Sequence, residues 1–249
     1  MIKKKIQIGI TSPTYNESEN VEVFIKGILS LTDTFDINIC FVDDDSRDNT
    51  IEIIEKYKNK FHKLHIIKRE KKKTTQVYSA YHDGLEWLYK NTHSNSFAQI
   101  DSDNICDVKT IRRAFNLLQN HPEIDLVKLS KYLNNQIDDR EFIRRLLSRI
   151  YTITCKLFYD RKITDYSTGI RFYNKNLTKH LINYKKKFTS PIGLLDDLLW
   201  TINNKFVIKE IDFKINERKF GNSFFRMGLI FTLGIDFIYC ILVHLSKNK

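Results

Sequence analysis

The stretch FAQIDSD, residues 97–103, joins a short apolar run to two aspartates that are separated by one residue. The apolar run is typical of a short buried strand, whereas aspartate is depleted in strands and rarely fully buried unless it is paired. Asp101 and Asp103 are therefore expected just beyond the end of a strand. Carboxylates there suit a hard divalent cation, which keeps waters or substrate phosphates as its other ligands. A solvated acidic loop is the alternative interpretation.

Apolar runs alternate with helical patterns on both sides of this stretch. Further strands are expected at residues 6–11, 37–42, 64–67 and 124–129. Apolar residues at helical spacing occur between these strands, at residues 21–29, 51–57, 76–89 and from residue 108 onward. Strands that alternate with helices predict parallel βαβ units and a doubly wound α/β sheet.

Polar clusters follow three of the expected strands: PTYNE at residues 13–17, DDDSRDNT at residues 43–50 and DSD at residues 101–103. In doubly wound sheets, ligands bind outside the carboxyl ends of the strands. Three coincident placements therefore favour a binding site at this edge. Helix capping within PTYNE and an acidic turn in the second cluster remain alternatives. A bound metal or Arg47 would relieve the repulsion among the three consecutive aspartates of the second cluster.

The pattern changes after about residue 132. A long helical stretch is expected at residues 138–158, with Arg140, Arg144, Arg145 and Arg149 near one another on its surface. The loop DYSTG at residues 165–169 follows, and then the segment IRFYN. A helix at residues 194–202 and a strand at residues 206–215 complete this region.

Composition restricts the functional classes that fit the chain. Its 249 residues are 42% apolar, which supports a sizeable core. The net charge of +11 suits an anionic membrane or a phosphorylated substrate. Nucleic acid is disfavoured as a partner, because no arginine-rich tail, zinc-finger spacing or aromatic-basic RNA motif occurs. The four cysteines lack CxxC spacing and indicate reduced structural thiols, and the N-terminus has no run of signal-peptide length.

The segment from Met227 to Leu245 is almost wholly apolar. Gly228, Thr232, Asp236 and Tyr239 form one weakly polar stripe at helical spacing. On an insertion scale, the penalty for Asp236 offsets the aliphatic residues, so a spanning helix is marginal. A helix that lies in the plane of one leaflet is the preferred interpretation. A core helix or a dimer-interface helix is the alternative.

Taken in order, PTYNE, VDDDSRDNT, DSD, DYSTGIRFY and ERKFGNS (residues 217–223) resemble family 2 glycosyltransferases of the GT-A fold. The resemblance is closest to polyprenyl- or dolichyl-phosphate mannose synthases and covers about residues 8–225. It implies a Rossmann-like mixed sheet flanked by helices in a catalytic domain at residues 1–224. The apolar C-terminal segment is expected to form a membrane-associating helix at residues 225–249, on the cytoplasmic face of a membrane.

The resemblance implies a set of donor-site residues. It places a GDP- or UDP-linked sugar against Pro13, Tyr15, Asn16, Glu17, Asp44, Asp101, Ser102 and Arg218. Asp101 and Asp103 match the metal-binding pair, and Mg²⁺ or Mn²⁺ would neutralise charge on the leaving nucleotide. Two positions depart from the family pattern, because Ile105 cannot ligate a metal and Phe224 replaces a lysine. In place of residue 105, either water or Asp107 is expected to help the metal.

The resemblance also implies an acceptor site, in which Lys131, Arg144 and Ser148 hold a polyprenyl phosphate. A phosphate acceptor is already anionic and needs orientation more than a general base. A hydroxyl acceptor in polysaccharide or lipopolysaccharide synthesis would need a carboxylate base, for which Asp196 and Asp197 are candidates. A catalytically weak, membrane-bound partner subunit is a third hypothesis. Homo-oligomer formation is left open.

Overall fold

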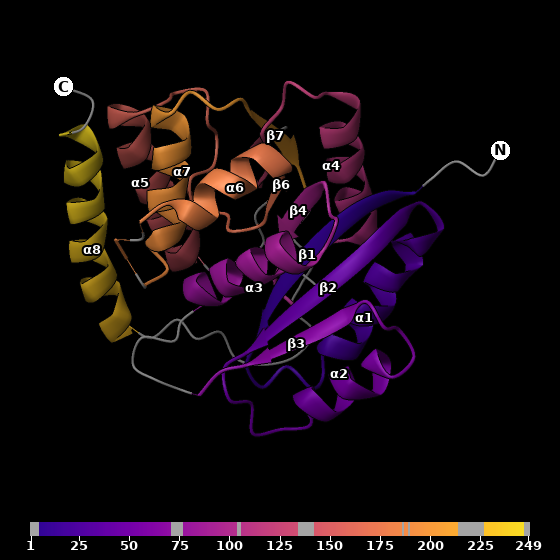
Figure 1. The fold of residues 1–249 in the computed structure, drawn as a ribbon. Coiled ribbons are helices and arrows are strands. Elements are labelled where there is room, and N and C mark those ends of the chain that lie inside the picture. The colour runs from indigo at the N-terminus through magenta and orange to yellow at the C-terminus, as the bar shows by residue number, and fades with distance from the viewer. Residues whose placement is uncertain are drawn as a thin grey trace.

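The computed structural model describes residues 5–70, 77–103, 106–133, 142–185, 187–188, 190–213 and 227–246. Within these ranges, strands pair into one sheet in the order β3-β2-β1-β4-β6-β5-β7 (Figure 1). The strands are β1 (Ile6–Thr14), β2 (Phe35–Asp43), β3 (Leu64–Lys68), β4 (Ser96–Gln99), β5 (Leu126–Ser130), β6 (Arg171–Asn174) and β7 (Ile208–Asp212). Strand β6 is antiparallel to both neighbours, whereas the other neighbouring pairs are parallel. The mixed sheet of the expected fold is thus confirmed.

Helices cover both faces of the sheet (Figure 1). Their bounds are α1 (Val21–Leu29), η1 (Ser30–Asp33), α2 (Thr50–Lys58), α3 (Val77–Asn91), α4 (Val108–Asn120), α5 (Phe142–Phe158), α6 (Lys175–Asn183), α7 (Gly193–Asn203) and α8 (Met227–Leu245). Apolar residues of α1, α2 and α4 form one core with one face of the sheet, and residues of α3, α5, α6, α7 and α8 form a second core on the other face. All four cysteines are buried and unpaired, as their spacing indicates.

Helix α3 packs very closely on the centre of the sheet, and Gly84 makes this approach feasible. A Cβ atom at Gly84 would lie 1.9 Å from Oγ1 of Thr11 on β1 and 3.1 Å from a methyl group of Val42 on β2. Both neighbours belong to central strands that cannot move independently. The glycine therefore fixes the distance between α3 and the strands whose ends carry the polar clusters.

The C-terminal helix α8 packs on the domain through one face only. Cys240, Ile241 and His244 are buried against it, and Nε2 of His244 lies 2.6 Å from Oδ1 of Asp196 on α7. The hydroxyl of Ser190 donates to Asp236 at 2.8 Å. One face of α8 is therefore a core face, as the alternative interpretation expects, while the other is exposed. Among the helices that the structure describes, none is long and apolar enough to cross a membrane.

We predict that Gly84→Ala lowers the free energy of unfolding by about 1–3 kcal/mol, because the added methyl group overpacks the contact with Thr11. Gly234→Ala in α8 is the matched control, since a Cβ atom there meets nothing within 4 Å. The control should be neutral or stabilising by up to about 1 kcal/mol, as expected for glycine to alanine in a helix. Urea unfolding measures both, and equal stabilities of the two variants would contradict the packing account.

Candidate active site

The polar clusters meet at one edge of the sheet. Strand β1 is parallel to β2 on one side and to β4 on the other, so their carboxyl ends lie together. The backbone N–H of Asp44 donates to Thr14 O at 3.0 Å, and that of Ile100 donates to Thr11 O at 3.1 Å. Asp44 and Asp101 therefore leave the sheet on opposite sides of β1. The loops after β5 and before β6 reach the same edge, because β5 runs parallel to β4.

The loop after β1 is tied to the loop after β2 by side-chain hydrogen bonds. The Oδ1 atom of Asn16 accepts the backbone N–H of Arg47 at 2.8 Å, and Ser46 Oγ accepts that of Asn16 at 2.9 Å. Asn16 has a φ of 54°, which asparagine tolerates better than most residues. Glu17 accepts from the side-chain amide of Asn20 at 2.8 Å. The side chains of Asn16 and Glu17, predicted to contact the nucleotide, thus shape the loop that would hold it.

The adjacent aspartates at the end of β2 have different environments. Asp43 is buried, and its oxygens accept from the hydroxyls of Thr14 at 3.0 Å and Ser46 at 2.6 Å. Asp44 is partly exposed, and one of its oxygens accepts from Nε and Nη2 of Arg69 at 2.6 and 2.5 Å. Burial raises the pKa of Asp44, and the hydrogen bond and charge of Arg69 oppose that shift. Of these two aspartates Asp44 is the more exposed, and its predicted contact with the nucleotide stays a prediction.

Arg69 is a site residue that the sequence patterns did not single out. It directly follows β3, and its Nη1 atom also contacts Asp83 at 2.8 Å and Ser79 at 2.9 Å on α3. The charge that pairs with Asp44 is therefore Arg69, whereas a bound metal or Arg47 had been expected to relieve the acidic cluster. Its position at the carboxyl end of a parallel strand was the available signal.

The Asp101–Asp103 turn alternates buried and half-exposed side chains. Ser102 is buried, and its hydroxyl donates to Pro13 O at 3.1 Å. The serine side chain, predicted to contact the nucleotide, instead ties the turn to β1. Asp101 and Asp103 on either side are half-buried, and the hydroxyl of Tyr81 on α3 donates to Asp101. Burial and the charge of Asp101 raise the pKa of Tyr81 well above its ordinary value.

This donor set fits a hard divalent cation. Two partly exposed carboxylates, with the turn between them anchored, supply the oxygen ligands that such a cation prefers. Asp107, which had been expected to help, instead caps α4. Its Oδ1 accepts the backbone N–H of Thr110 at 2.8 Å, and its Oδ2 accepts the hydroxyl of Thr110 at 3.0 Å. Residue Ile105 lies outside the described residues.

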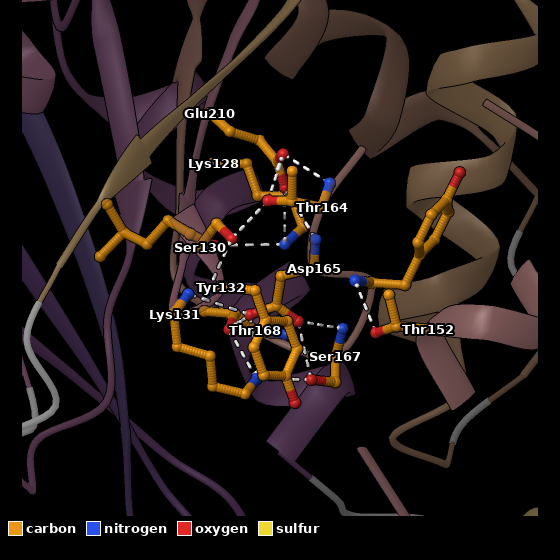
Figure 2. Close-up of polar contacts among 12 residues, drawn as sticks. Lys128, Ser130, Lys131, Tyr132, Thr152, Thr164, Asp165, Ser167, Thr168 and Glu210 are labelled. Carbon is orange, nitrogen blue, oxygen red and sulfur yellow. Dashed lines mark hydrogen bonds and ion pairs between the residues drawn. The ribbon is translucent and has the colours of Figure 1, made fainter. Parts of the chain in front are cut away.

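Lys131 is the centre of a buried polar cluster below the DYSTG loop (Figure 2). Only 4% of Lys131 is exposed, and its Nζ atom contacts Asp165 at 2.9 Å, Ser167 at 2.6 Å and Thr168 at 3.2 Å. The lysine predicted to bind the acceptor phosphate is therefore held in an ion pair. The structure corrects that prediction, because this geometry gives Lys131 a positioning role.

Asp165 is fully buried in this cluster and remains ionised. Burial disfavours its charge, but the ammonium groups of Lys128 and Lys131 and the hydrogen bond from Thr168 hold its pKa well below the usual range. Burial lowers the pKa of Lys128 to about 8. Glu210 on β7 accepts the backbone N–H groups of Thr164 and Asp165 at 2.6 and 3.1 Å. The loop before β6 is therefore fixed by charge and hydrogen bonds from β5 and β7.

The remaining acceptor candidates lie on α5. Ser148 Oγ lies 2.7 Å from Ser167 Oγ and accepts from the hydroxyl of Tyr132 at 2.9 Å. The serine therefore joins α5 to the DYSTG loop, and its predicted contact with an acceptor phosphate stays a prediction. Arg144 lies within α5, but its side chain is outside the described set, as is all of Arg218.

The two aspartates of α7 face different helices. Asp196 is 1% exposed and contacts His244 of α8, while the hydroxyl of Tyr184 donates to it at 3.1 Å. This sealed position shows that Asp196 is wrong as a candidate base. Asp197 accepts from the hydroxyl of Tyr78 on α3 at 2.9 Å. A Cβ atom at Gly193 would lie 2.2 Å from the Tyr78 ring, so the glycine lets this tyrosine reach Asp197.

Comparison with known proteins decides the family. A model of the family described as "Glycosyl transferase family 2" matches residues 10–182, which include the loops after β1, β2 and β4 and the DYSTG loop.

The chain belongs to glycosyltransferase family 2.

Similar proteins come from sequence and from structure. A curated dolichol-phosphate mannosyltransferase of Pyrococcus furiosus is 27% identical over 145 residues, which are 58% of this chain and 39% of that relative. The chain thus matches well under half the length of that relative. A glucosyl-3-phosphoglycerate synthase of Mycobacterium tuberculosis, in complex with Mn²⁺, UDP-glucose and phosphoglyceric acid, has a TM-score of 0.70 and 17% identity over 97% of this chain and 80% of that chain. S. aureus TarS 1–349 has a TM-score of 0.59 and 18% identity, and the match covers 84% of this chain and 59% of that chain. These two structures confirm the GT-A fold.

We predict that Lys131→Met lowers the free energy of unfolding by about 3–5 kcal/mol, because Asp165 keeps a buried charge without its nearest partner. The exposed Lys90→Met is the matched control and should cost about 0–1 kcal/mol, since its contact with Glu86 is a surface pair. Adding Asp165→Asn to Lys131→Met should recover part of the loss. If Lys131→Met is as stable as the wild type but binds the acceptor more weakly, Lys131 contacts the acceptor phosphate directly, which would contradict the positioning role.

We predict that Arg69→Gln weakens nucleoside diphosphate binding by about tenfold or more, because Asp44 loses its charge-assisted hydrogen bonds. Arg112→Gln serves as control, since Arg112 on α4 pairs with the exposed Asp33 of η1. Calorimetric titration of UDP and GDP measures both variants. Equal affinities for Arg69→Gln and Arg112→Gln would show that the Asp44–Arg69 pair takes no part in nucleotide binding.

Proposed function

We propose that the protein transfers a hexose, mannose or glucose, from a GDP- or UDP-linked sugar to a polyprenyl monophosphate, with inversion at the anomeric carbon. The family and the similarity to a dolichol-phosphate mannosyltransferase support this proposal. The observation that carries it is the placement of Asp44 and Asp101 on either side of the end of β1. A nucleoside and its diphosphate would lie across that strand end.

The donor would be held by residues with separate tasks. Asp44, oriented by Arg69, would accept hydrogen bonds from the base or ribose, and Pro13 and Tyr15 would border it. Asp101 and Asp103 would hold Mg²⁺ or Mn²⁺, which several of the structural neighbours bind together with UDP. When bound, the cation supplies charge neutralisation on the leaving diphosphate. Arg218 is proposed to add a positive charge at the same diphosphate.

A phosphate acceptor explains why no exposed base is needed beside the cluster of Lys131. A phosphate oxygen is anionic near neutral pH, so the protein must orient it and exclude water. Asp165 and Lys131 would keep the DYSTG loop in one conformation, with Ser148 at its border. Arg144 is proposed as the direct phosphate contact, because a guanidinium binds phosphate through two hydrogen bonds.

Transfer to a hydroxyl is the second candidate function, and Asp197 favours it. Its carboxylate lies on α7 near α3, and a hydroxyl acceptor would need such a base. The M. tuberculosis neighbour was crystallised with phosphoglyceric acid, which provides one soluble acceptor to test. A weakly catalytic partner subunit stays the third possibility, because Ile105 and Phe224 depart from the family pattern.

One assay separates these functions. The protein receives labelled GDP-mannose or UDP-glucose with Mn²⁺, and polyprenyl phosphate or a soluble hydroxyl acceptor. We expect label to enter the organic phase, to fall by about a hundredfold or more in Asp101→Asn, and to change little in Asp197→Asn. If label enters the soluble acceptor and this transfer falls strongly in Asp197→Asn, the acceptor is a hydroxyl and not a phosphate. No turnover and no nucleotide binding would support the partner subunit.

A further inference from the structure

Three buried side chains that the donor and acceptor sites leave unused meet between α7 and α8. They are Asp196 on α7 and Cys240 and His244 on α8, and each is at most 1% exposed. One carboxylate oxygen, the Cys240 Sγ atom and one imidazole nitrogen all lie within 4.8 Å of one another. No other group of three or more histidine, cysteine, aspartate or glutamate side chains in the described part of the chain is this close. We call these three side chains the α7–α8 cluster.

Helix α8 turns several of its few polar side chains toward the domain. Cys240 and His244 are four positions apart, so they lie one helical turn apart on the same face. Asp236, four positions before Cys240, belongs to this face and accepts a hydrogen bond from Ser190 at 2.8 Å. Two ligands at a spacing of four on one helix can bind the same ion, as the two histidines of the H-E-x-x-H pattern do. The spacing along α8 therefore suits a metal site.

One oxygen of Asp196 has no partner in the fold as described. The Oδ1 atom is satisfied, because Nε2 of His244 lies 2.6 Å away and the hydroxyl of Tyr184 donates to it at 3.1 Å. The Oδ2 atom is buried and makes no hydrogen bond to any of the described residues. A buried polar atom that gives up water without gaining a partner destabilises the fold. A cation beside Oδ2 would supply the missing interaction.

The charges and donor types of the α7–α8 cluster fit a zinc ion. A carboxylate and a thiolate carry two negative charges and a neutral imidazole carries none, so a divalent ion makes the cluster neutral. Neutrality matters here because an uncompensated charge is costly in a buried position. Sulfur and nitrogen donors suit Zn²⁺, whereas Mg²⁺ and Ca²⁺ prefer oxygen ligands alone. The cluster therefore differs in kind from the all-oxygen pair of Asp101 and Asp103.

We infer that the α7–α8 cluster binds Zn²⁺ through the carboxylate of Asp196, the thiolate of Cys240 and Nε2 of His244. Asp196 has a second oxygen with which to fill the fourth position of a tetrahedral ion. Binding would release the thiol proton of Cys240 to solvent and leave Nε2 of His244 without a proton. The ion would thus replace the direct hydrogen bond between Asp196 and His244 by a bond from each of them to the metal.

Neighbouring side chains are placed to orient two of the three ligands. The amide nitrogen of Asn203, at the end of α7, lies 3.4 Å from Nδ1 of His244. With the amide turned over, its oxygen would accept the N–H that Nδ1 carries when Nε2 binds a metal. The hydroxyl of Tyr184 already donates to Oδ1 of Asp196. Such outer contacts fix the orientation of metal ligands in proteins.

The ion would fasten α8 to the domain. Two ligands come from α8 and one from α7, and Asp196 and His244 are 48 positions apart in the chain. Asp197, the next residue of α7, accepts from the hydroxyl of Tyr78 on α3 at 2.9 Å. The same turn of α7 would therefore be held by the ion on one side and by α3 on the other. This role goes beyond the proposed function and does not depend on the donor or the acceptor.

Metal binding by the full chain, first stripped of metal with a chelator, tests the inference without an activity assay. The background is Asp101→Asn, which lacks one ligand of the proposed donor-site pair. Co²⁺ serves as a coloured substitute for Zn²⁺. We expect one equivalent to bind with a sulfur-to-cobalt charge-transfer band in the near ultraviolet, which Zn²⁺ abolishes by displacing Co²⁺. The remaining oxygen ligands of the donor site cannot produce this band.

Two cysteine variants in this background locate the site. Cys240→Ala removes the sulfur ligand and leaves both members of the Asp196–His244 pair in place. It should remove the band and weaken Co²⁺ and Zn²⁺ binding by about tenfold or more. Cys40→Ala is the matched control, because Cys40 on β2 is also a fully buried free cysteine, and it should bind as the background does. Circular dichroism verifies that both variants are folded.

Thermal unfolding gives a second measure of the same site. Saturating Zn²⁺, compared with chelator, should raise the melting temperature of the background protein by about 5 °C or more and leave that of Cys240→Ala unchanged. Equal metal affinities for Cys240→Ala and Cys40→Ala would overturn the inference. Absence of the band in the background protein would also overturn it, whether or not Cys240→Ala folds, and Asp196 and His244 would then form a buried pair without a metal.

Discussion

The parallel pairing of β1 with β2 on one side and β4 on the other determines where the chemistry of this protein can take place. Hydrogen bonds from Asp44 and Ile100 to β1 extend this pairing beyond the ends of β2 and β4. Asp44, proposed to contact the nucleoside, and Asp101, proposed to bind the metal, are thereby held a strand apart. The absence of a side chain at Gly84 lets α3 pack closely on the same strand. From α3, Tyr81 contacts Asp101 and Asp83 contacts Arg69. One strand and one helix thus position the whole donor side.

Buried charge organises the other half of the site. Asp165 keeps its charge between Lys128 and Lys131, and Glu210 fixes the backbone of the same loop from the edge of the sheet. Such groups are costly unless all are paired. Their arrangement gives the DYSTG loop one conformation between α5 and the sheet. These contacts join the DYSTG loop to α5 and to the sheet on the side of the site where we propose that the acceptor binds.

Much of the fold and of the donor site follows from local sequence patterns. The strands, the polar clusters after them and the long helix α5 depend on patterns along the chain, and the structure confirms their placement. The pairs that cross the fold could not be predicted in this way. Arg69 with Asp44, Tyr81 with Asp101 and Lys131 with Asp165 join residues between 20 and 34 positions apart. The hydroxyl tether of Ser102 and the helix cap of Asp107 could not be predicted, because in sequence both resemble ligand contacts.

The central claim is that Asp44 and the Asp101–Asp103 pair serve one bound nucleotide. Calorimetric titration of UDP or GDP in the presence and absence of Mn²⁺ tests it most directly. The account predicts that each ligand tightens the binding of the other, that Asp101→Ala removes this coupling, and that Asp44→Ala weakens nucleotide binding while Mn²⁺ alone still binds. Nucleotide binding that is indifferent to Mn²⁺ and to both substitutions would contradict the account.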